Sequence, residues 1–304
     1  MDGDAVVCCI VLATCSAVAS AAAAVAYSKG LLSFIFPQDG GAPGPGGRPL
    51  PVPDLRMNVA PWYIRDIRNR DLLSVETSTG GGNVLRYNYK KGLAGGPSGA
   101  AIYANPLRMF PADSATLSFS VYFPPDFEFV RAGKLLGLSI GQKPGDHASG
   151  GEWSPTSGSM RFMWRQPEGD RAAVVGYLYF AVAGGASKAF AKQGPATQGV
   201  LEAEDPSGHN IWYHKGGGMF VRKGQWNALS VTVVLNTPGK ADGVLKMTVN
   251  GVSRQVNDMV YRESASVRIN ETFLASIFGG NSAAKFASPK DTFSLVRDFR
   301  IVAS

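Results

Sequence analysis

The sequence predicts an all-β protein, a jelly-roll β-sandwich with an N-terminal transmembrane helix. Many short segments beyond residue 54 alternate apolar and polar side chains, as strands do when one face is buried. Gly, Pro and Asn separate these segments, as turn residues would. The 304-residue chain is 45% hydrophobic and 17% charged, which excludes disorder for the chain as a whole and allows a large buried core.

A membrane anchor is predicted at the N-terminus, over residues 1–36. Ala5 to Ser28 carries no charged residue, and a helix of that length would cross a hydrocarbon core of about 30 Å. The alternative is a cleaved signal peptide, because Ala-x-Ala sequences lie near Ala22 to Ala26. The chain begins Met-Asp-Gly-Asp, whereas a signal peptide normally begins with positive charge, so we expect an uncleaved single span.

All three cysteines, Cys8, Cys9 and Cys15, lie within this predicted anchor. Their position rules out a disulfide framework, a thiolate zinc site and a cysteine nucleophile in the rest of the chain. We expect them to be small apolar side chains of the membrane helix, with palmitoylation as the alternative.

A Pro/Gly-rich linker is predicted over residues 37–54, followed by one folded domain over residues 55–304. Leaving out Asp2 and Asp4 raises the formal net charge from +7 to +9. This balance suits an acidic partner such as a polyanionic sugar, lipid headgroups or nucleic acid, although solubility alone would also explain it. The basic residues are scattered and no nucleic-acid-binding motif is present, so no nucleic acid is expected.

The clearest strand pattern is the strict alternation of Thr116 to Phe123, which Pro124-Pro125 ends. Asn250-Gly251 is a two-residue hairpin signal. The remaining predicted strands are Ala100–Tyr103, Leu135–Ile140, Met160–Arg165, Val174–Ala181, Leu229–Leu235, Val244–Val249, Val252–Val256, Phe273–Phe278 and Phe293–Val302. No segment after the anchor has a long helical period with caps.

Three of these strands bring polar side chains to one face of a sheet. Alternation places Ser159 and Arg161 on one face of their strand, and Tyr177 and Tyr179 on one face of theirs, while Lys134 begins another strand. Burying Lys, Arg, Ser and two Tyr as core would be costly, so we expect them to line a water-filled cleft. Alternation alone favours the plainer interpretation, a solvated sheet face with ordinary tyrosine packing.

Several motifs of the sequence resemble polysaccharide lyase family 14, which includes alginate and glucuronan lyases of chlorella viruses and molluscs. The resemblance covers roughly Asn83 to Ser304. It is carried by the motifs GPSGAAIYANPL, GKLLGL, GSMRFMWR, GYLYF, FVRKGQWNALSVTVVLNTPGKADGVLKMTVNG and IFGGNSAAKFASPKDTFSLVRDFRIV. It implies a jelly roll whose concave face binds an acidic polysaccharide.

The resemblance also implies a site. The family's functional lysine falls on Lys134, its Ser-x-Arg pair on Ser159 and Arg161, and its Tyr-x-Tyr pair on Tyr177 and Tyr179. We therefore expect Lys134, Tyr177 and Tyr179 to be catalytic and Ser159 and Arg161 to bind substrate. No metal or cofactor is expected.

The residue types suit β-elimination from a uronate. The proton at C5 is weakly acidic because the neighbouring carboxylate resists a second negative charge, and Lys134 and Arg161 could neutralise that carboxylate. A base must remove the proton and an acid must protonate the leaving oxygen at C4. Tyrosine can serve in either step, and Lys134 could itself be the base.

Some positions depart from the family's pattern or carry motifs of their own. Residues 145–156 form a long Gly/Ser insertion beside the predicted cleft, and Lys285-Phe286 stands where a Trp is expected. His147, His209 and His214 are expected at the surface, with His209 or His214 as an alternative at the cleft rim. Asn270-Glu271-Thr272 matches the glycosylation acceptor pattern, which matters only in a secretory lumen.

Two functions follow from the sequence. The first is a membrane-tethered lyase that cleaves a uronate-containing polysaccharide of the glucuronan or alginate type. The second is a non-catalytic structural or glycan-binding jelly roll, such as a minor capsid protein joined to a membrane and to other capsid proteins. Either would be a single-pass, membrane-anchored protein, in a virion inner membrane and capsid or at a cell surface.

Overall fold

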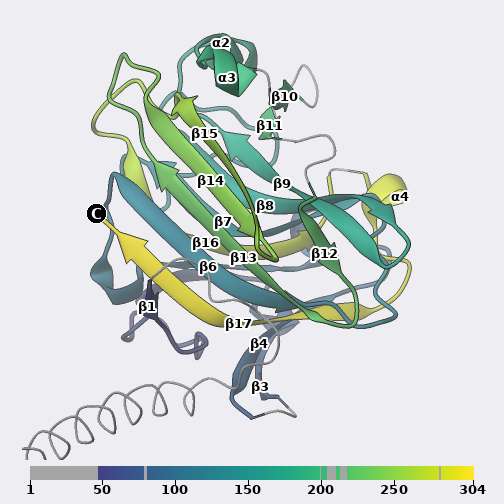
Figure 1. The fold of residues 1–304 in the computed structure, drawn as a ribbon. Coiled ribbons are helices and arrows are strands. Elements are labelled where there is room, and N and C mark those ends of the chain that lie inside the picture. Colours follow the sequence, from purple (N-terminus) through teal and green to yellow (C-terminus); the bar gives the residue numbers. More distant parts are fainter. Residues whose placement is uncertain (1–46, 79–80, 199, 204–209, 213–217, 281) are drawn as a thin grey trace, which may run out of the picture. The chain divides into compact units, whose positions relative to one another are not determined.

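The computed structural model describes residues 47–78, 81–198, 200–203, 210–212, 218–280 and 282–304. These residues form two antiparallel sheets packed face to face, so the predicted all-β sandwich is confirmed (Figure 1). No helix in this part of the chain is long and apolar enough to cross a membrane. The predicted span from Ala5 to Ser28 lies outside the described residues.

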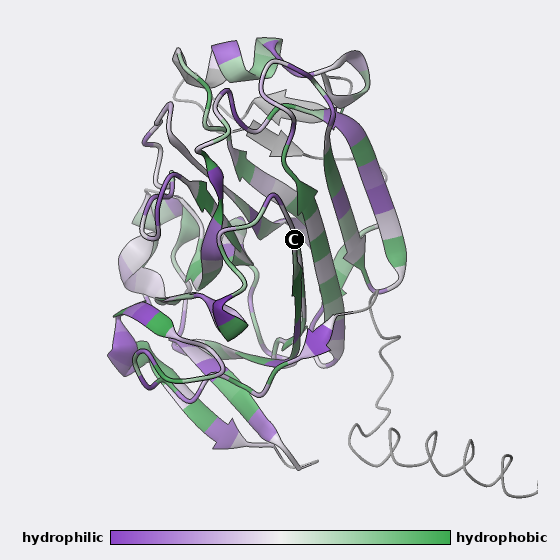
Figure 2. Ribbon diagram, turned by 90° about the vertical axis from the view of Figure 1, so that its left-hand side faces the viewer, coloured by the Kyte–Doolittle hydropathy of each residue, from purple (hydrophilic) through white to green (hydrophobic). Residues whose placement is uncertain are grey.

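One sheet contains eight of the described strands. In spatial order they are β15 (Val252–Met259), β14 (Gly243–Val249), β13 (Trp226–Val234), β6 (Ser114–Tyr122), β17 (Thr292–Ala303), β4 (Asn83–Tyr89) and β3 (Leu73–Thr77), with β1 (Arg48–Pro49) paired to β17. Its strands alternate as predicted, with the apolar residues of β6 directed into the core. Bands of hydrophobic and hydrophilic residues therefore alternate along the strands in Figure 2.

The other sheet contains nine of the described strands. In spatial order they are β10 (Leu201–Ala203), β11 (Asn210–Trp212), β9 (Arg171–Tyr179), β8 (Ser157–Glu168), β7 (Ala132–Gly141), β16 (Arg268–Phe278), β5 (Ala100–Ala104) and β2 (Ile64–Arg68), with β12 (Phe220–Arg222) paired to β9. Each strand segment predicted from the sequence overlaps a strand of one of the two sheets.

Helices are short in the described chain. They are α2 (Gly185–Ala191), α3 (Pro195–Gln198), α4 (Ala283–Phe286) and the 3-10 turns η1 (Arg70–Leu72), η2 (Gly96–Ser98) and η3 (Pro106–Arg108). α2 and α3 lie beyond one end of the sandwich (Figure 1). The longest of these helices has seven residues, in agreement with the lack of long helical periodicity in the sequence.

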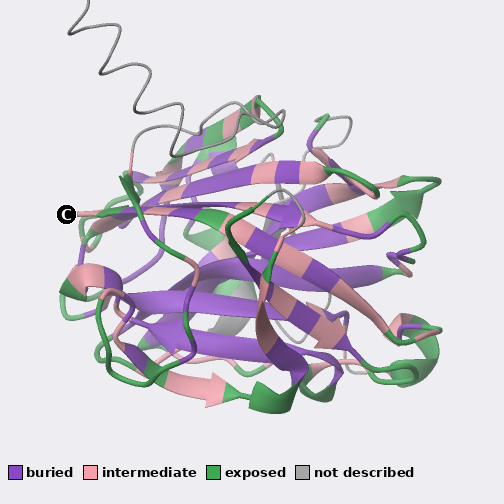
Figure 3. Cartoon of the chain, turned by 90° about the horizontal axis from the view of Figure 1, so that it is seen from below, coloured by how far each residue is buried: buried purple, intermediate pink, exposed green. Residues whose placement is uncertain are grey.

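The core between the sheets is rich in aromatic side chains. Phe123, Phe127 and Trp164 pack with ring centroids 4.8 to 6.0 Å apart. Trp164 lies directly against β7 at Gly133, where a Cβ atom would be only 1.8 Å from the indole ring. Glycine is therefore required immediately before Lys134. Strands β7, β8 and β16 are buried over most of their length, whereas β17 alternates between buried and partly exposed residues. Figure 3 shows buried and partly exposed stretches along the strands.

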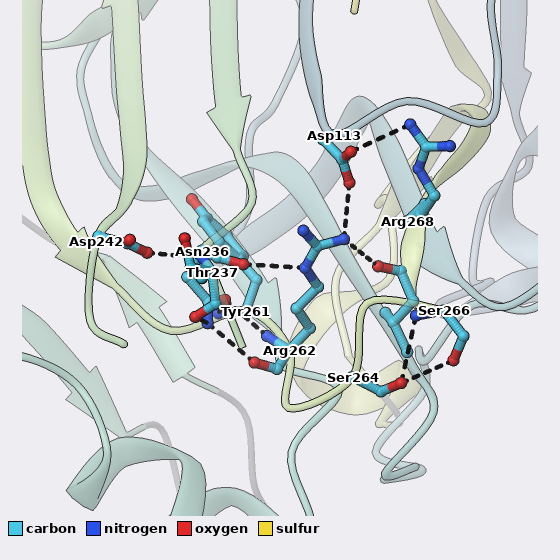
Figure 4. Close-up of polar contacts among 10 residues, drawn as sticks. Asp113, Asn236, Thr237, Asp242, Tyr261, Arg262, Ser264, Ser266 and Arg268 are labelled. Atoms are coloured by element: carbon cyan, nitrogen blue, oxygen red, sulfur yellow. Dashed lines mark hydrogen bonds and ion pairs between the residues drawn. The ribbon is translucent and has the colours of Figure 1, made fainter. Parts of the chain in front are cut away.

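A charged cluster joins the two sheets at one end (Figure 4). Asp113, just before β6, accepts hydrogen bonds from Arg262 at 2.7 Å and from Arg268, the first residue of β16, at 3.2 Å. Arg262 also donates to the carbonyl oxygens of Asn236 and Val267. Because the buried Arg262 guanidinium has both a carboxylate and carbonyl acceptors, this cluster is a structural clamp.

Candidate active site

The five residues expected to form the site lie on three neighbouring strands of the nine-stranded sheet. In the register of β8 and β9, Ser159 is opposite Tyr179 and Arg161 is opposite Tyr177. Residues directly opposite one another in an antiparallel pair lie about 5 Å apart on the same face. The predicted faces of β8 and β9 are therefore correct, and the neighbouring apolar residues of both strands point into the core.

Lys134 reaches this face through a β-bulge in β7. Lys134 is opposite Met163 and Gly137 is opposite Arg161, so β7 has one residue more than β8 between these pairs. Without the extra residue, Leu135 would occupy the site face and Lys134 would point into the core. Ser276 donates a hydrogen bond to the Lys134 carbonyl oxygen at 3.3 Å and supports the bulge.

The cations and phenols of the site are in mutual contact. The hydroxyl oxygens of Tyr177 and Tyr179 are 3.0 Å apart, within hydrogen-bond distance. Lys134 Nζ lies 4.6 Å from the centroid of the Tyr177 ring, and the Arg161 guanidinium lies 5.5 Å from the same ring. Both cations thus lie close enough to interact with the π face of Tyr177.

Arg161 is a buried cation that packs against aromatic rings. Its exposed fraction is 3%, and among the described residues no acceptor bonds to its Nε or Nη2 atoms. Burial lowers the pKa of the guanidinium from its ordinary value, although an arginine remains protonated at neutral pH. The contacts that stabilise it are chiefly with the Phe273 ring at 4.5 Å. Two buried N–H groups without an acceptor cost free energy, and an anion that accepted hydrogen bonds from both would remove that cost.

The site is covered by the chain itself, at residues 142–156 between β7 and β8, which we name the covering loop. Ser159 Oγ donates to the Ala148 carbonyl oxygen at 2.7 Å, and the Gly151 N–H donates to the Tyr179 hydroxyl oxygen at 2.9 Å. Tyr179 and Ser159 have no exposed surface, and Lys134 is only 6% exposed. The expectation of a water-filled cleft is therefore wrong for this structure, because the insertion lies over the sheet face.

His147 is part of this cover, so the expectation of a surface histidine is wrong at this position. Its ring stacks on Tyr103 at 4.8 Å and packs against Phe273 at the same centroid distance. Burial, with smaller effects from the charges of Arg68 and Arg161, lowers the pKa of His147 to about 4. The imidazole is consequently neutral at pH 7. His209 and His214 lie outside the described residues.

Sequence reasoning missed a carboxylate at the base of the covering loop. Glu271 is buried, forms two hydrogen bonds of 2.9 Å with Arg65, and accepts from the Gly145 N–H at 3.1 Å. The neighbouring Asn270 is also buried and donates to the carbonyl oxygens of Lys143 and Asp146. The Asn270 amide is therefore not available as a glycosylation acceptor in the folded chain.

Two other sequence features can be placed. Phe286, at the position where a Trp was expected, packs against the apolar side chains around Tyr177 and Tyr179. Within the described residues, no group of three or more His, Cys, Asp and Glu side chains is arranged to hold a metal ion.

The fold and the site together define a β-sandwich protein with two cations and two phenols gathered on one face of its larger sheet. The sequence profile described as Polysaccharide lyase 14 matches residues 77–299. Because this match covers most of the chain, the chain belongs to polysaccharide lyase family 14, as the sequence motifs indicated.

Comparison with individual proteins agrees with this assignment. The chain is 25% identical over 202 residues to "Exolysin" of Paramecium bursaria Chlorella virus 1, a match that covers 62% of this chain but 29% of that protein. The chain therefore corresponds to less than a third of that relative's length.

Solved structures of lyases have the same fold. Alginate lyase vAL-1 from Chlorella virus superposes with a TM-score of 0.65 at 23% identity, covering 80% of this chain and 93% of that one. The marine PL-14 alginate lyase from Aplysia kurodai gives a TM-score of 0.65 at 26% identity, covering 79% and 90%.

Proposed function

We propose that this protein is a polysaccharide lyase that cleaves a uronate-containing polymer, of the alginate or glucuronan type, by β-elimination. The observation that carries the proposal is Arg161, a buried guanidinium with two N–H groups that no acceptor among the described residues satisfies. A uronate carboxylate fits this demand, because it is planar and accepts two parallel hydrogen bonds from a guanidinium. Family membership supports the same reaction class.

In this mechanism the carboxylate at C5 is neutralised first. Arg161 binds the carboxylate, and Lys134 adds a second positive charge on the same face. Loss of the C5 proton then places negative charge on a group already held by cations, in a site where water does not weaken the attraction. Ser159 supplies a hydroxyl beside Tyr179 that can hydrogen-bond the sugar or orient the phenol.

Proton transfer is assigned to the two phenols. One of Tyr177 and Tyr179 reacts as a phenolate and takes the C5 proton, and the C5–H electron pair forms the C4–C5 double bond as the C4–O bond breaks. The other phenol gives its proton to the departing oxygen. With the two hydroxyls 3.0 Å apart, one proton transfer between them restores the starting state. Lys134 as the base is the alternative within the same site.

The experiment measures the ultraviolet absorbance of the unsaturated uronate when the full-length chain is incubated with alginate or polyglucuronate. Tyr179→Phe is expected to lower the rate by a factor of about 10²–10⁴, because it removes one proton-transfer group. Lys134→Ala is expected to lower it as well. The matched control is Tyr261→Phe, a buried tyrosine whose hydroxyl bonds to the Val244 carbonyl away from the site. Equal rates for Tyr179→Phe and Tyr261→Phe would exclude the phenol mechanism.

The second candidate function is a non-catalytic glycan-binding or structural module. It is favoured by one observation, the burial of all five site residues, of which Ser159 and Tyr179 bond to the covering loop. Tight binding of a polyuronate without any absorbance change would support a glycan-binding role. The absence of both would support a structural role, for example in contact with capsid proteins.

We also propose the predicted organisation as an anchor over residues 1–36, a linker over 37–54 and the lyase domain over 55–304. Its support is the charge-free stretch from Ala5 to Ser28 and the Pro/Gly-rich sequence after it. This arrangement would hold the domain at a membrane, in a virion or at a cell surface. Flotation of the full-length chain with lipid vesicles, lost on deletion of residues 5–28, tests it.

A further inference from the structure

We propose that the covering loop is an autoinhibitory lid, which closes the site without substrate and is displaced by the polyuronate. The inference rests on the proposed function, since it concerns access to the same site. The loop contains the Gly/Ser insertion of residues 145–156 and lies over β8 and β9. A polymer cannot reach Arg161 or Tyr179 while these residues stay covered.

The covering loop uses the hydrogen-bonding groups that a sugar would use. Its Ala148 carbonyl oxygen accepts from Ser159, and its Gly151 N–H donates to Tyr179. Its described residues supply no acceptor to Nε and Nη2 of Arg161. The closed state therefore satisfies the hydroxyls of Ser159 and Tyr179 but not Nε and Nη2 of Arg161, and an anionic ligand would satisfy all of them.

The first half of the covering loop is firmly attached. Asn270 Nδ2 donates to the Lys143 carbonyl at 2.6 Å and to the Asp146 carbonyl at 3.0 Å, while Glu271 holds the Gly145 N–H. Asn270 and Glu271 belong to β16, in the middle of the sheet. These bonds hold the chain up to Asp146 in place whether the rest of the covering loop is closed or open.

The second half of the covering loop is attached through the bonds of Ala148 and Gly151 to the site and through Trp153. Gly150 and Gly151 have φ values of 73° and 92°, in the left-handed region that favours glycine, and a Cβ at Gly150 would meet nothing within 4 Å. Beyond them Trp153 packs against Tyr179 and donates from its indole to the Val182 carbonyl at 2.9 Å. We assign the moving part to residues 148–155, which Trp153 holds closed together with the bonds of Ala148 and Gly151 to the site.

The test uses a thiol placed under the covering loop. In the full-length chain with Cys8, Cys9 and Cys15 replaced by Ser, Ser159→Cys supplies the sole thiol, because the sequence has no other cysteine. Its reaction rate with a small aromatic disulfide is measured with and without Trp153→Ala. We expect Trp153→Ala to raise the rate at least tenfold, because it increases the fraction of open molecules.

The matched control is Ser118→Cys, a similarly buried serine on β6 of the other sheet. Its rate should not respond to Trp153→Ala. Trp153→Phe keeps an aromatic ring but loses the indole donor, and an intermediate rate is expected if the alanine variant folds poorly. Circular dichroism of each variant shows whether it is folded.

If Trp153→Ala leaves the thiol reaction rate of folded Ser159→Cys unchanged, the proposal that the covering loop is a lid is wrong. A rate for Ser159→Cys alone that equals the rate of an exposed thiol would also overturn it. With Ser159 intact, Trp153→Ala is expected to raise kcat/KM on polyuronate by the same factor as the thiol rate. A faster thiol reaction at position 159 with no unsaturated product from Trp153→Ala would support the moving loop and contradict the proposed lyase function.

Discussion

Two buried arginines of this protein have opposite surroundings. Arg262, 7% exposed, donates to the Asp113 carboxylate and to two backbone carbonyl oxygens, and it joins the two sheets (Figure 4). Arg161, 3% exposed, has aromatic rings around it, and Nε and Nη2 have no acceptor among the described residues. The first guanidinium is satisfied by the fold, whereas the second is satisfied only by something that binds.

We propose that this difference separates a structural buried charge from one that binds a ligand. A buried charge whose partners belong to the fold contributes to the structure, and a substitution that removes it lowers the stability of the fold. An unpaired buried charge costs stability, so its presence points to a ligand that offsets the cost on binding. The same substitution at the two arginines should therefore have opposite consequences.

Within this comparison of the two arginines, the larger expected effect is the loss of activity at Arg161. Arg161→Met keeps most of the side-chain volume but removes the charge that binds the uronate carboxylate, so kcat/KM should fall by a factor of about 10²–10³. The free energy of unfolding should stay within about 1 kcal/mol of the wild type, since the lost cation–π contacts are offset by removal of a buried charge. Urea denaturation alongside the absorbance assay measures both quantities.

The matched substitution Arg262→Met should act on stability. It leaves Asp113 without its shorter hydrogen bond and breaks the contacts to Asn236 and Val267, so the free energy of unfolding should fall by about 2–3 kcal/mol. The folded molecules should keep the wild-type kcat/KM at a temperature well below their midpoint. A selective loss of kcat/KM in folded Arg262→Met would remove the distinction between the two sites.

A smaller effect is expected at His147, which lies in the covering loop against two aromatic rings. Its folded pKa of about 4 lies below the unfolded value of 6.5, so the unfolded chain binds more protons between these pH values. Its contribution to stability is complete above about pH 6.5 and is lost as the pH falls through 4. The shift sets an upper limit of about 3 kcal/mol, and for a half-buried ring we expect about 1 kcal/mol.

The comparison for this prediction is His147→Phe, which preserves stacking on Tyr103 and Phe273. Urea denaturation at pH 7 and pH 4 should show the wild type losing about 1 kcal/mol more than the variant. Equal losses would mean that His147 is not buried by the loop in solution.

Much of the sandwich could be predicted because alternation records which face of a strand is buried. As expected, alternate apolar residues face the core in two predicted strands, Thr116 to Phe123 and Met160 to Arg165. The edge strand β2 was missed because its sequence, IRDIR, is largely charged and does not alternate clearly. β4, NVLRYNY, does alternate over its last five residues and could have been found.

The sequence predicted that the five candidate residues share one sheet face, and the structure brings them together, but their surroundings could not be predicted. Strict alternation cannot place Lys134 beside Arg161, since that requires the extra residue of the β7 bulge. The burial of the site depends on where residues 142–156 fold back, and this is set by long-range bonds such as Gly145 to Glu271. Composition showed an insertion and gave no indication of the surface it covers.

The central claim is that this sheet face performs β-elimination, and the mass of the products tests it most directly. The wild-type protein, Trp153→Ala and Arg161→Met are each incubated with polyglucuronate and with alginate. The masses of the polysaccharide fragments are then measured by mass spectrometry. We predict that the fragments with a new non-reducing end are one water lighter than hydrolysis products, and that they form faster with Trp153→Ala and far more slowly with Arg161→Met. Polymer left uncleaved by both the wild type and Trp153→Ala, or fragments with the mass of hydrolysis products, would contradict β-elimination at this sheet face.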